Sequence, residues 1–208
     1  MAALVRSKLR YETELTGALP GIRARFEAVA QVDPSTLDDA GFVVGGYCPG
    51  TSLVALVTGE IGSGKSTALR YVTESLHPAE HLCLYVTATS GSILELYRQI
   101  LGALGVDNRG VSRALMLQTI RGQVMELTSA KRLKVLLIID EASLLRMEVF
   151  AELHTLMQFE KDAKPFLPLV MAGQNNLIDS LNYRPAMPLA SRVVARSHLE
   201  GANLPLMT

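Results

Sequence analysis

The 208-residue chain lacks several features that mark specialised classes of protein. It has only two cysteines, Cys48 and Cys83, far apart and without a histidine or cysteine at metal-ligand spacing, so neither a disulfide framework nor a zinc site is predicted. Its 20 basic residues are balanced by 20 acidic ones. This balance argues against binding nucleic acid or anionic membrane through overall charge, and any contact with DNA would have to be local.

Long apolar runs are also missing. The longest, at residues 53–57 and 135–139, fall far short of the roughly 18 residues that a membrane span needs. Residues 1–10 carry charges and have no apolar stretch followed by a cleavage site, which argues against a secretory signal. We therefore expect a cytoplasmic protein that makes no contact with a membrane.

From about residue 52, short apolar runs alternate with stretches of helical periodicity, a pattern typical of βαβ units around a parallel sheet. The pattern predicts strands at 52–58, 81–88, 133–139, 167–172 and 194–199, and helices at 65–76, 92–104, 113–131, 146–161 and 175–181. The expected fold class is α/β, a three-layer sandwich with a five-stranded parallel sheet. Residues 1–51 are predicted to be an appendage with one helix near 22–32, and residues 52–208 to be the core domain.

The segment GEIGSGKS at residues 59–66 fits the phosphate-binding pattern G-x-x-x-x-G-K-[ST] in full, between a predicted strand and a predicted helix. Its glycines allow backbone N–H groups to point inward, and the positive end of the helix favours a phosphate there. Lys65 is expected to reach the β- and γ-phosphates of ATP, and the Ser66 hydroxyl to ligate Mg²⁺. The predicted nucleotide-binding residues are Gly59, Gly62, Ser63, Gly64, Lys65, Ser66 and Thr67.

A second motif, a pair of acidic residues, follows the strand predicted at 133–139. Asp140 and Glu141 come directly after this apolar run, where a buried parallel strand opens into the ligand crevice. Asp140 is predicted to hold the Mg²⁺ shell, through water, and Glu141 to polarise a water molecule against the γ-phosphate. An acidic cap of the next helix is an alternative explanation of the pair.

Together these residues resemble the AAA+ ATPases and, within them, the ExeA-like (general secretion pathway A-type) group, which is similar to the transposition helper ATPases of the Mu B and TniB kind. The resemblance rests on the segments VTGEIGSGKSTALR (57–70), LLIIDEASLL (136–145), FAELHTLMQFE (150–160), LVMAGQNNLIDSL (169–181) and MPLASRV (187–193). It implies that the strand ending near Gly173 lies between the strand before the phosphate-binding loop and the strand before Asp140.

The resemblance also implies two further catalytic residues. Gln174 takes the position of the polar sensor of the γ-phosphate, with helix capping as the alternative. Arg192 takes the position of an arginine that reaches the nucleotide of a neighbouring subunit in a homo-oligomer; Arg184 and Arg196 compete for this role, and a solvated surface arginine is the other interpretation. Few residues follow Leu199, so the helical lid domain that usually comes next in the family is not expected in this chain.

The sequence thus predicts a Mg-ATP-dependent ATP hydrolase whose cycle controls its assembly. The resemblance favours a DNA transposition helper, with double-stranded DNA and a transposase as partners, over a secretion ATPase. Two other hypotheses stay open: an ATP-gated binding module with little hydrolysis, and a kinase of small molecules.

Overall fold

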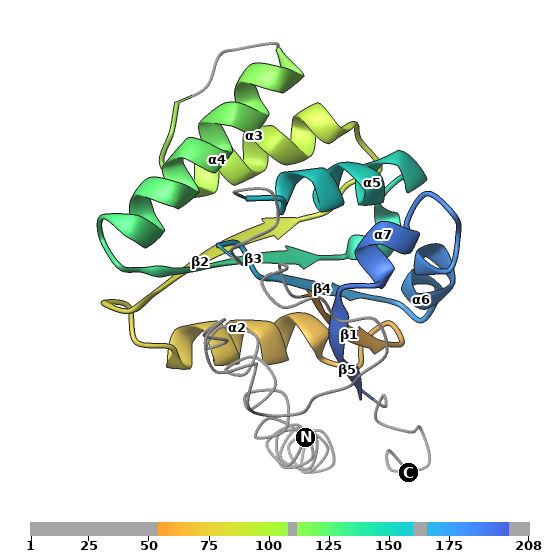
Figure 1. The fold of residues 1–208 in the computed structure, drawn as a ribbon. Helices are drawn as coiled ribbons and strands as arrows, with labels where there is room; N and C mark the ends of the chain where they lie inside the picture. The colour runs from red at the N-terminus through yellow and green to blue at the C-terminus, as the bar shows by residue number, and fades with distance from the viewer. Residues whose placement is uncertain (1–53, 108–111, 160–165, 200–208) are drawn as a thin grey trace, which may run out of the picture.

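Five parallel strands form the centre of the structure, a computed structural model that describes residues 54–107, 112–159 and 166–199 (Figure 1). The strands are β1 (Val54–Gly59), β2 (His81–Thr87), β3 (Lys134–Asp140), β4 (Leu169–Gly173) and β5 (Val193–Leu199). Their order in the sheet is β2-β3-β4-β1-β5, and every pair is parallel. This confirms the predicted fold class and the predicted place of β4 between β3 and β1.

The burial of the strands explains their sequences. Every residue of β1 and β4 is buried, as is every residue of β3 after Lys134, because helices cover both faces of the central strands. A continuous apolar run is therefore required there, which is what the sequence provides. The outermost strands, β2 and β5, are only partly buried, with exposed residues alternating along much of each.

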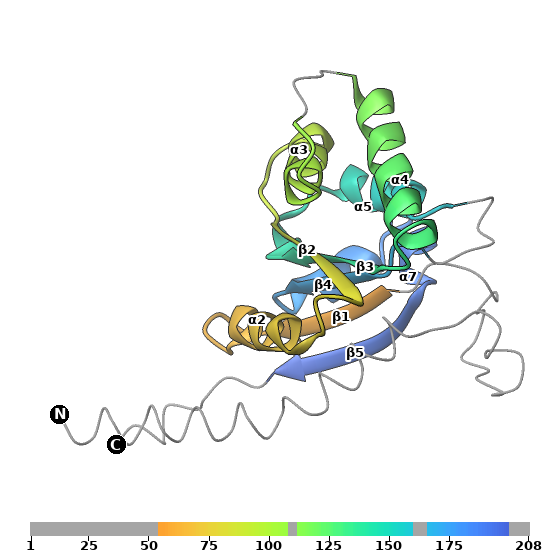
Figure 2. The same ribbon diagram turned by 90° about the vertical axis from the view of Figure 1, so that its left-hand side faces the viewer.

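Helices cover the two faces of the sheet unequally (Figure 2). On one face α2 (Lys65–Ser75) packs with Leu69 and Val72 against β1, β3 and β4. The opposite face is covered by α3 (Ile93–Ala103), α4 (Arg113–Ser129), α5 (Met147–Leu156), α6 (Asn176–Leu181) and α7 (Met187–Ala190). Among the described residues, no helix is long and apolar enough to cross a membrane.

The structure differs from the predicted secondary structure at one helix end and contains two short helices that were not predicted. Helix α5 ends at Leu156, earlier than the predicted residue 161, because the chain turns at Met157, and residues 160 and 161 lie outside the described part. Helix α7 and the short 3₁₀ helix η2 (Ala142–Leu144) were not predicted. The predicted appendage at 1–51, its helix at 22–32 and the first residues of the predicted core domain also lie outside the described residues.

The topology brings three strand ends together. Because β1, β4 and β3 are neighbours and parallel, the chain leaves all three at the same edge of the sheet. The phosphate-binding loop follows β1, Gln174 follows β4, and Asp140 ends β3. Residues that are more than 70 positions apart in the sequence, such as Lys65 and Glu141, therefore meet at this edge.

Candidate functional site: a phosphate-binding pocket

The backbone of the phosphate-binding loop depends on glycine at two positions. Gly62 and Gly64 have φ angles of 80° and 86°, in the left-handed region that other residues rarely adopt. Gly64 is the N-cap of α2, and among the described residues no side chain forms a capping hydrogen bond to this helix. Because Gly64 has no side chain that could accept the first N–H groups of α2, these groups and the positive end of the helix suit an anion.

The Lys65 side chain is folded back onto its own loop. Only 6% of Lys65 is exposed, and its ammonium group donates hydrogen bonds to the carbonyl oxygens of Gly59, at 2.9 Å, and Glu60, at 2.8 Å. A buried ammonium needs such partners, since a buried charge without them is costly. The two carbonyls hold the positive charge at the pocket, where it can meet a phosphate.

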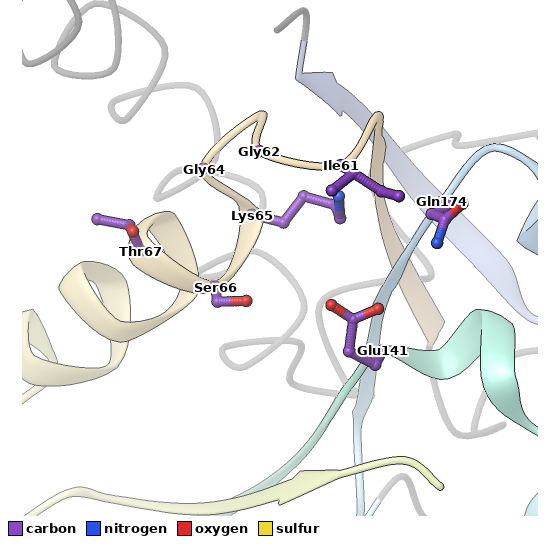
Figure 3. Close-up of a pocket in the computed structure, with 8 residues that line it drawn as sticks. All are labelled: Ile61, Gly62, Gly64, Lys65, Ser66, Thr67, Glu141 and Gln174. Carbon is purple, nitrogen blue, oxygen red and sulfur yellow. The ribbon is translucent and has the colours of Figure 1, made fainter. Parts of the chain in front are cut away.

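Figure 3 shows the pocket that these elements enclose, with a volume of about 440 Å³. In this view Lys65, Ser66 and Glu141 point into the same space, whereas Thr67 points away from Glu141. The pocket thus unites residues predicted from the two motifs with the predicted sensor. Its lining residues are Ile61, Gly62, Gly64, Lys65, Ser66, Thr67, Glu141 and Gln174.

Asp140 lies at the end of β3, 5% exposed, with both carboxylate oxygens already engaged. Its Oδ1 accepts the backbone N–H of Glu141 at 2.9 Å, and its Oδ2 accepts the Tyr85 hydroxyl at 2.6 Å. Burial, and then the hydrogen bond to Asp140, raises the pKa of the Tyr85 hydroxyl above its ordinary value. The hydroxyl therefore stays protonated and acts as the donor.

Glu141 has an unusual backbone. Its φ of 54° and ψ of 32° are left-handed, a conformation that costs a non-glycine residue about 1–2 kcal/mol. Such strain persists where the surrounding structure enforces it, and it is concentrated at functional sites. Here the bond from the Glu141 N–H to Asp140 supports the turn, and the side chain lines the pocket.

The predicted sensor, Gln174, is followed by a second polar residue, Asn175, and the two have different contacts. Gln174 lines the pocket, and its backbone N–H donates to the Ser143 hydroxyl at 3.3 Å. Asn175 is the N-cap residue of α6, and no described side chain forms a capping bond there, so the helix-capping interpretation of Gln174 finds no support. Instead, the Asn175 amide donates to the Glu60 carboxylate at 2.7 Å and joins this segment to the phosphate-binding loop.

Four predicted residues, Gly59, Ser63, Asp140 and Arg192, are not among those that line the pocket. Gly59 and Ser63 belong to the loop but do not line the cavity. Ser63 is 3% exposed, and its hydroxyl has no hydrogen-bond partner within the part of the chain that the structure describes. The carbonyl of Arg192 accepts the N–H of Val54 at the start of β1, so its backbone lies roughly 17 Å along the strand from the loop. Arg192 is 7% exposed, which contradicts the interpretation of a solvated surface arginine.

The donor set fits a Mg-nucleotide. The described residues contain no group of three or more His, Cys, Asp or Glu side chains that could hold a metal ion by themselves. One hydroxyl, from Ser66, and one carboxylate, from Asp140, is the sparse set that Mg²⁺ uses when phosphate oxygens and water complete its shell. The Lys65 ammonium and the uncapped start of α2 are the matching donors for those phosphates.

Sequence reasoning missed three residues at this site: Tyr85, Glu60 and Ile61, whose side chain is 81% exposed at the pocket. Tyr85 lies in a strand that carries no motif. Its contact with Asp140 arises from the pairing of β2 with β3, where Tyr85 is opposite Ile138. A signal was present in the alternation along β2, which puts Cys83, Tyr85 and Thr87 on one face, but the neighbouring strand had to be known to use it.

Comparison with known proteins assigns the chain to a family. Residues 50–181, more than half of the chain, match the family described as AAA domain. The chain belongs to the AAA domain family. This AAA-domain chain is also 30% identical over 174 residues to the general secretion pathway protein A of Aeromonas hydrophila. The match covers 83% of this chain and 29% of that protein. These matches confirm the resemblance to the ExeA-like AAA+ ATPases.

Solved structures of other proteins share the fold. Cdc6p from Pyrobaculum aerophilum aligns with a TM-score of 0.55 and 22% identity, over 73% of this chain and 40% of that one. The Aeropyrum pernix ORC1 protein, solved in complex with DNA, aligns with a TM-score of 0.58 and 16% identity, over 92% of this chain and 46% of that one. The chain thus spans less than half the length of each of these relatives.

Proposed function

We propose that this AAA-domain chain binds Mg-ATP and hydrolyses it, and that the cycle controls its assembly on a partner. The observation that carries the proposal is the convergence of Lys65, Ser66, Glu141 and Gln174 on one pocket from three neighbouring strand ends. Phosphoryl transfer needs positioning and charge stabilisation rather than covalent chemistry from the protein, and this set supplies both.

Each residue has a role that follows from its place. The first turn of α2 and the Lys65 ammonium bind the phosphates, with Lys65 exchanging its loop carbonyls for phosphate oxygens. Ser66 and Asp140 hold Mg²⁺, which when bound neutralises charge on the phosphates. Glu141 accepts the proton of the attacking water, and Gln174 orients that water or the γ-phosphate from the end of β4.

The trans role of Arg192 is part of the same proposal. A guanidinium from a neighbouring copy would stabilise charge that develops on the phosphoryl group. Burial of Arg192 in the single chain means that its side chain would have to become accessible at the interface between copies. Arg184 and Arg196 are both exposed and remain the competitors.

For the partner, we propose double-stranded DNA and a transposase, as the family resemblance implies. Balanced overall charge restricts any DNA contact to a local basic patch, such as Lys131, Arg132 and Lys134, all of which are exposed. The named role of the Aeromonas hydrophila relative supports a second candidate, an ATPase in general secretion. The two differ in one measurable property, the response of ATP hydrolysis to DNA.

The test is phosphate release from Mg-ATP by the wild type and by Glu141→Gln, with and without duplex DNA, over a range of protein concentrations. We expect Glu141→Gln to bind ATP as the wild type does and to hydrolyse it about 10²- to 10⁴-fold more slowly, because it lacks the base. Stimulation by DNA and a rate that rises faster than linearly with protein concentration would support the transposition role.

Other outcomes separate the alternatives. ATP binding without hydrolysis by the wild type would favour the ATP-gated binding module and overturn the catalytic proposal. Phosphate transfer that depends on an added small acceptor would favour the kinase. Hydrolysis that DNA leaves unchanged would favour the secretion role.

A further inference from the structure

The hydrogen bond between Tyr85 and Asp140 links strand β2, which carries no motif, to the proposed metal-binding carboxylate. Its O···O distance of 2.6 Å is in the range of a charge-assisted bond between a hydroxyl and a carboxylate. Such bonds are about twice as strong as neutral ones. Because Asp140 is 5% exposed, little water competes with Tyr85 for this oxygen.

The bond is the first of two that fix the end of β3. Tyr85 holds Oδ2 of Asp140, and Oδ1 accepts the N–H of Glu141, whose backbone is left-handed. A carboxylate held at both oxygens has one side-chain orientation. The position of Tyr85 is therefore transmitted through Asp140 to the turn that aims Glu141 into the pocket.

The neighbours of Tyr85 are suited to a positioning role. Tyr85 lies in the edge strand β2, on the face of the sheet that α2 covers. It is 36% exposed, so its ring is not a large part of the core. In the register of the sheet it is opposite Ile138, two residues before Asp140. Side chains two residues apart on a strand share a face, so Tyr85 and Asp140 lie on the same face of the sheet, and their hydrogen bond spans this diagonal.

We infer that Tyr85 is a positioning residue for the metal site: its hydroxyl orients the Asp140 carboxylate toward Mg²⁺ and, through it, the turn at Glu141. The inference rests on the proposed function, because it assigns to Asp140 the Mg²⁺ of the nucleotide complex. Groups that hydrogen-bond to metal ligands fix their orientation, and their loss costs about 10- to 100-fold in metal affinity or activity.

The experiment measures binding of a fluorescent ATP analogue to the full chain, in excess Mg²⁺ and in EDTA. The dissociation constant in EDTA, divided by that in excess Mg²⁺, gives a ratio that reports how strongly Mg²⁺ contributes to nucleotide binding. For Tyr85→Phe, we expect this ratio to fall about tenfold. Affinity in EDTA should be unchanged, because Lys65 and the start of α2 bind phosphate without Asp140.

Tyr97→Phe is the matched control. The Tyr97 hydroxyl also donates to a carboxylate, Glu152 at 3.4 Å, but it belongs to the core on the opposite face of the sheet. Both variants thus lose a bond between tyrosine and a carboxylate, and Tyr97→Phe should retain the wild-type ratio. Far-UV circular dichroism of each variant establishes that it is folded.

A second comparison tests whether Tyr85 acts through Asp140. In an Asp140→Ala background, Tyr85→Phe should have no further effect on the ratio, since the group that it orients is gone. This double-mutant comparison still decides the matter if Tyr85→Phe lowers the overall stability of the fold, because the effect of lost stability would remain in the Asp140→Ala background.

The outcomes separate this inference from the proposed function. A wild type that binds no nucleotide, or binds it without help from Mg²⁺, would overturn the proposed function and this inference with it. A wild type that responds to Mg²⁺ while Tyr85→Phe keeps the same ratio would overturn the inference alone. A rise in the ratio would also overturn it, because the hydroxyl would then compete with the metal rather than position its ligand.

Discussion

Replacing Gly59 by alanine probes the packing beneath the phosphate-binding loop. A Cβ atom at this position would lie 2.4 Å from the carbonyl oxygen of Leu199 and 2.6 Å from the Ser63 hydroxyl. Gly59 does not have a positive φ, so alanine is compatible with its backbone conformation. The cost of the substitution is therefore steric, and it falls on the contact between β1 and β5.

The magnitude follows from what must move. The distance from the new Cβ to the Leu199 oxygen has to lengthen from 2.4 Å to at least 3.0 Å. That oxygen belongs to the backbone of β5, where Leu199 pairs with Gly59 itself, so the strands must separate at their last pair. Overpacking of this kind costs about 1–3 kcal/mol. We expect Gly59→Ala to lower the free energy of unfolding by that amount.

The assay is urea denaturation followed by far-UV circular dichroism, with Gly122→Ala as the matched control. Gly122 is exposed in the middle of α4, and a Cβ there would meet no atom within 4 Å. Alanine at this position should stabilise the chain by about 0.5–1 kcal/mol, because glycine is a poor helix former. The two variants should thus change stability in opposite directions. A Gly59→Ala protein as stable as the wild type would refute the reasoning.

Three further predictions concern Asn175 and Arg192. Asn175→Asp should weaken ATP binding, measured by titration. It replaces the amide that lies 2.7 Å from the Glu60 carboxylate with a second carboxylate, and the two negative charges repel each other. Adding Glu60→Gln removes one of these charges and should restore affinity. Arg192→Ala should lower the free energy of unfolding by about 1–3 kcal/mol, whereas Arg184→Ala, at an exposed residue, should change it by less than about 0.5 kcal/mol. If Arg192 acts in trans, mixing inactive Arg192→Ala with inactive Glu141→Gln should restore phosphate release, since each supplies what the other lacks; no recovery would contradict the trans role.

The central strands of this fold could be predicted because burial on both faces requires a continuous apolar run in the sequence. A strand such as β3 has to be apolar between its ends, and the polar residue that ends it, Asp140, marks the edge of the sheet. The phosphate-binding loop was recognisable for a similar reason, because the left-handed backbone at Gly62 and Gly64 requires glycine at fixed positions.

The features that were not predicted have no comparable pattern in the sequence. Helix α7 spans four residues, Met187–Ala190, too few for a helical period to be visible. The contact of Tyr85 with Asp140 depends on which strands are neighbours and in what register, and no property of Tyr85 in the sequence reveals this. The position of Arg192 came from family resemblance, which indicates a place in the chain but not whether the guanidinium is exposed.

The contacts at the site imply that most of it is already arranged before a ligand binds. Asp140 is held at both oxygens, the turn at Glu141 is fixed by one of those bonds, and Asn175 is tied to the loop through Glu60. Groups fixed during folding need not be reorganised at the moment of reaction, which is how enzymes obtain electrostatic stabilisation at low cost. Lys65 differs, because the carbonyls that hold its ammonium have to be exchanged for phosphate oxygens. Nucleotide binding should therefore change the contacts of Lys65 more than those of the acidic residues.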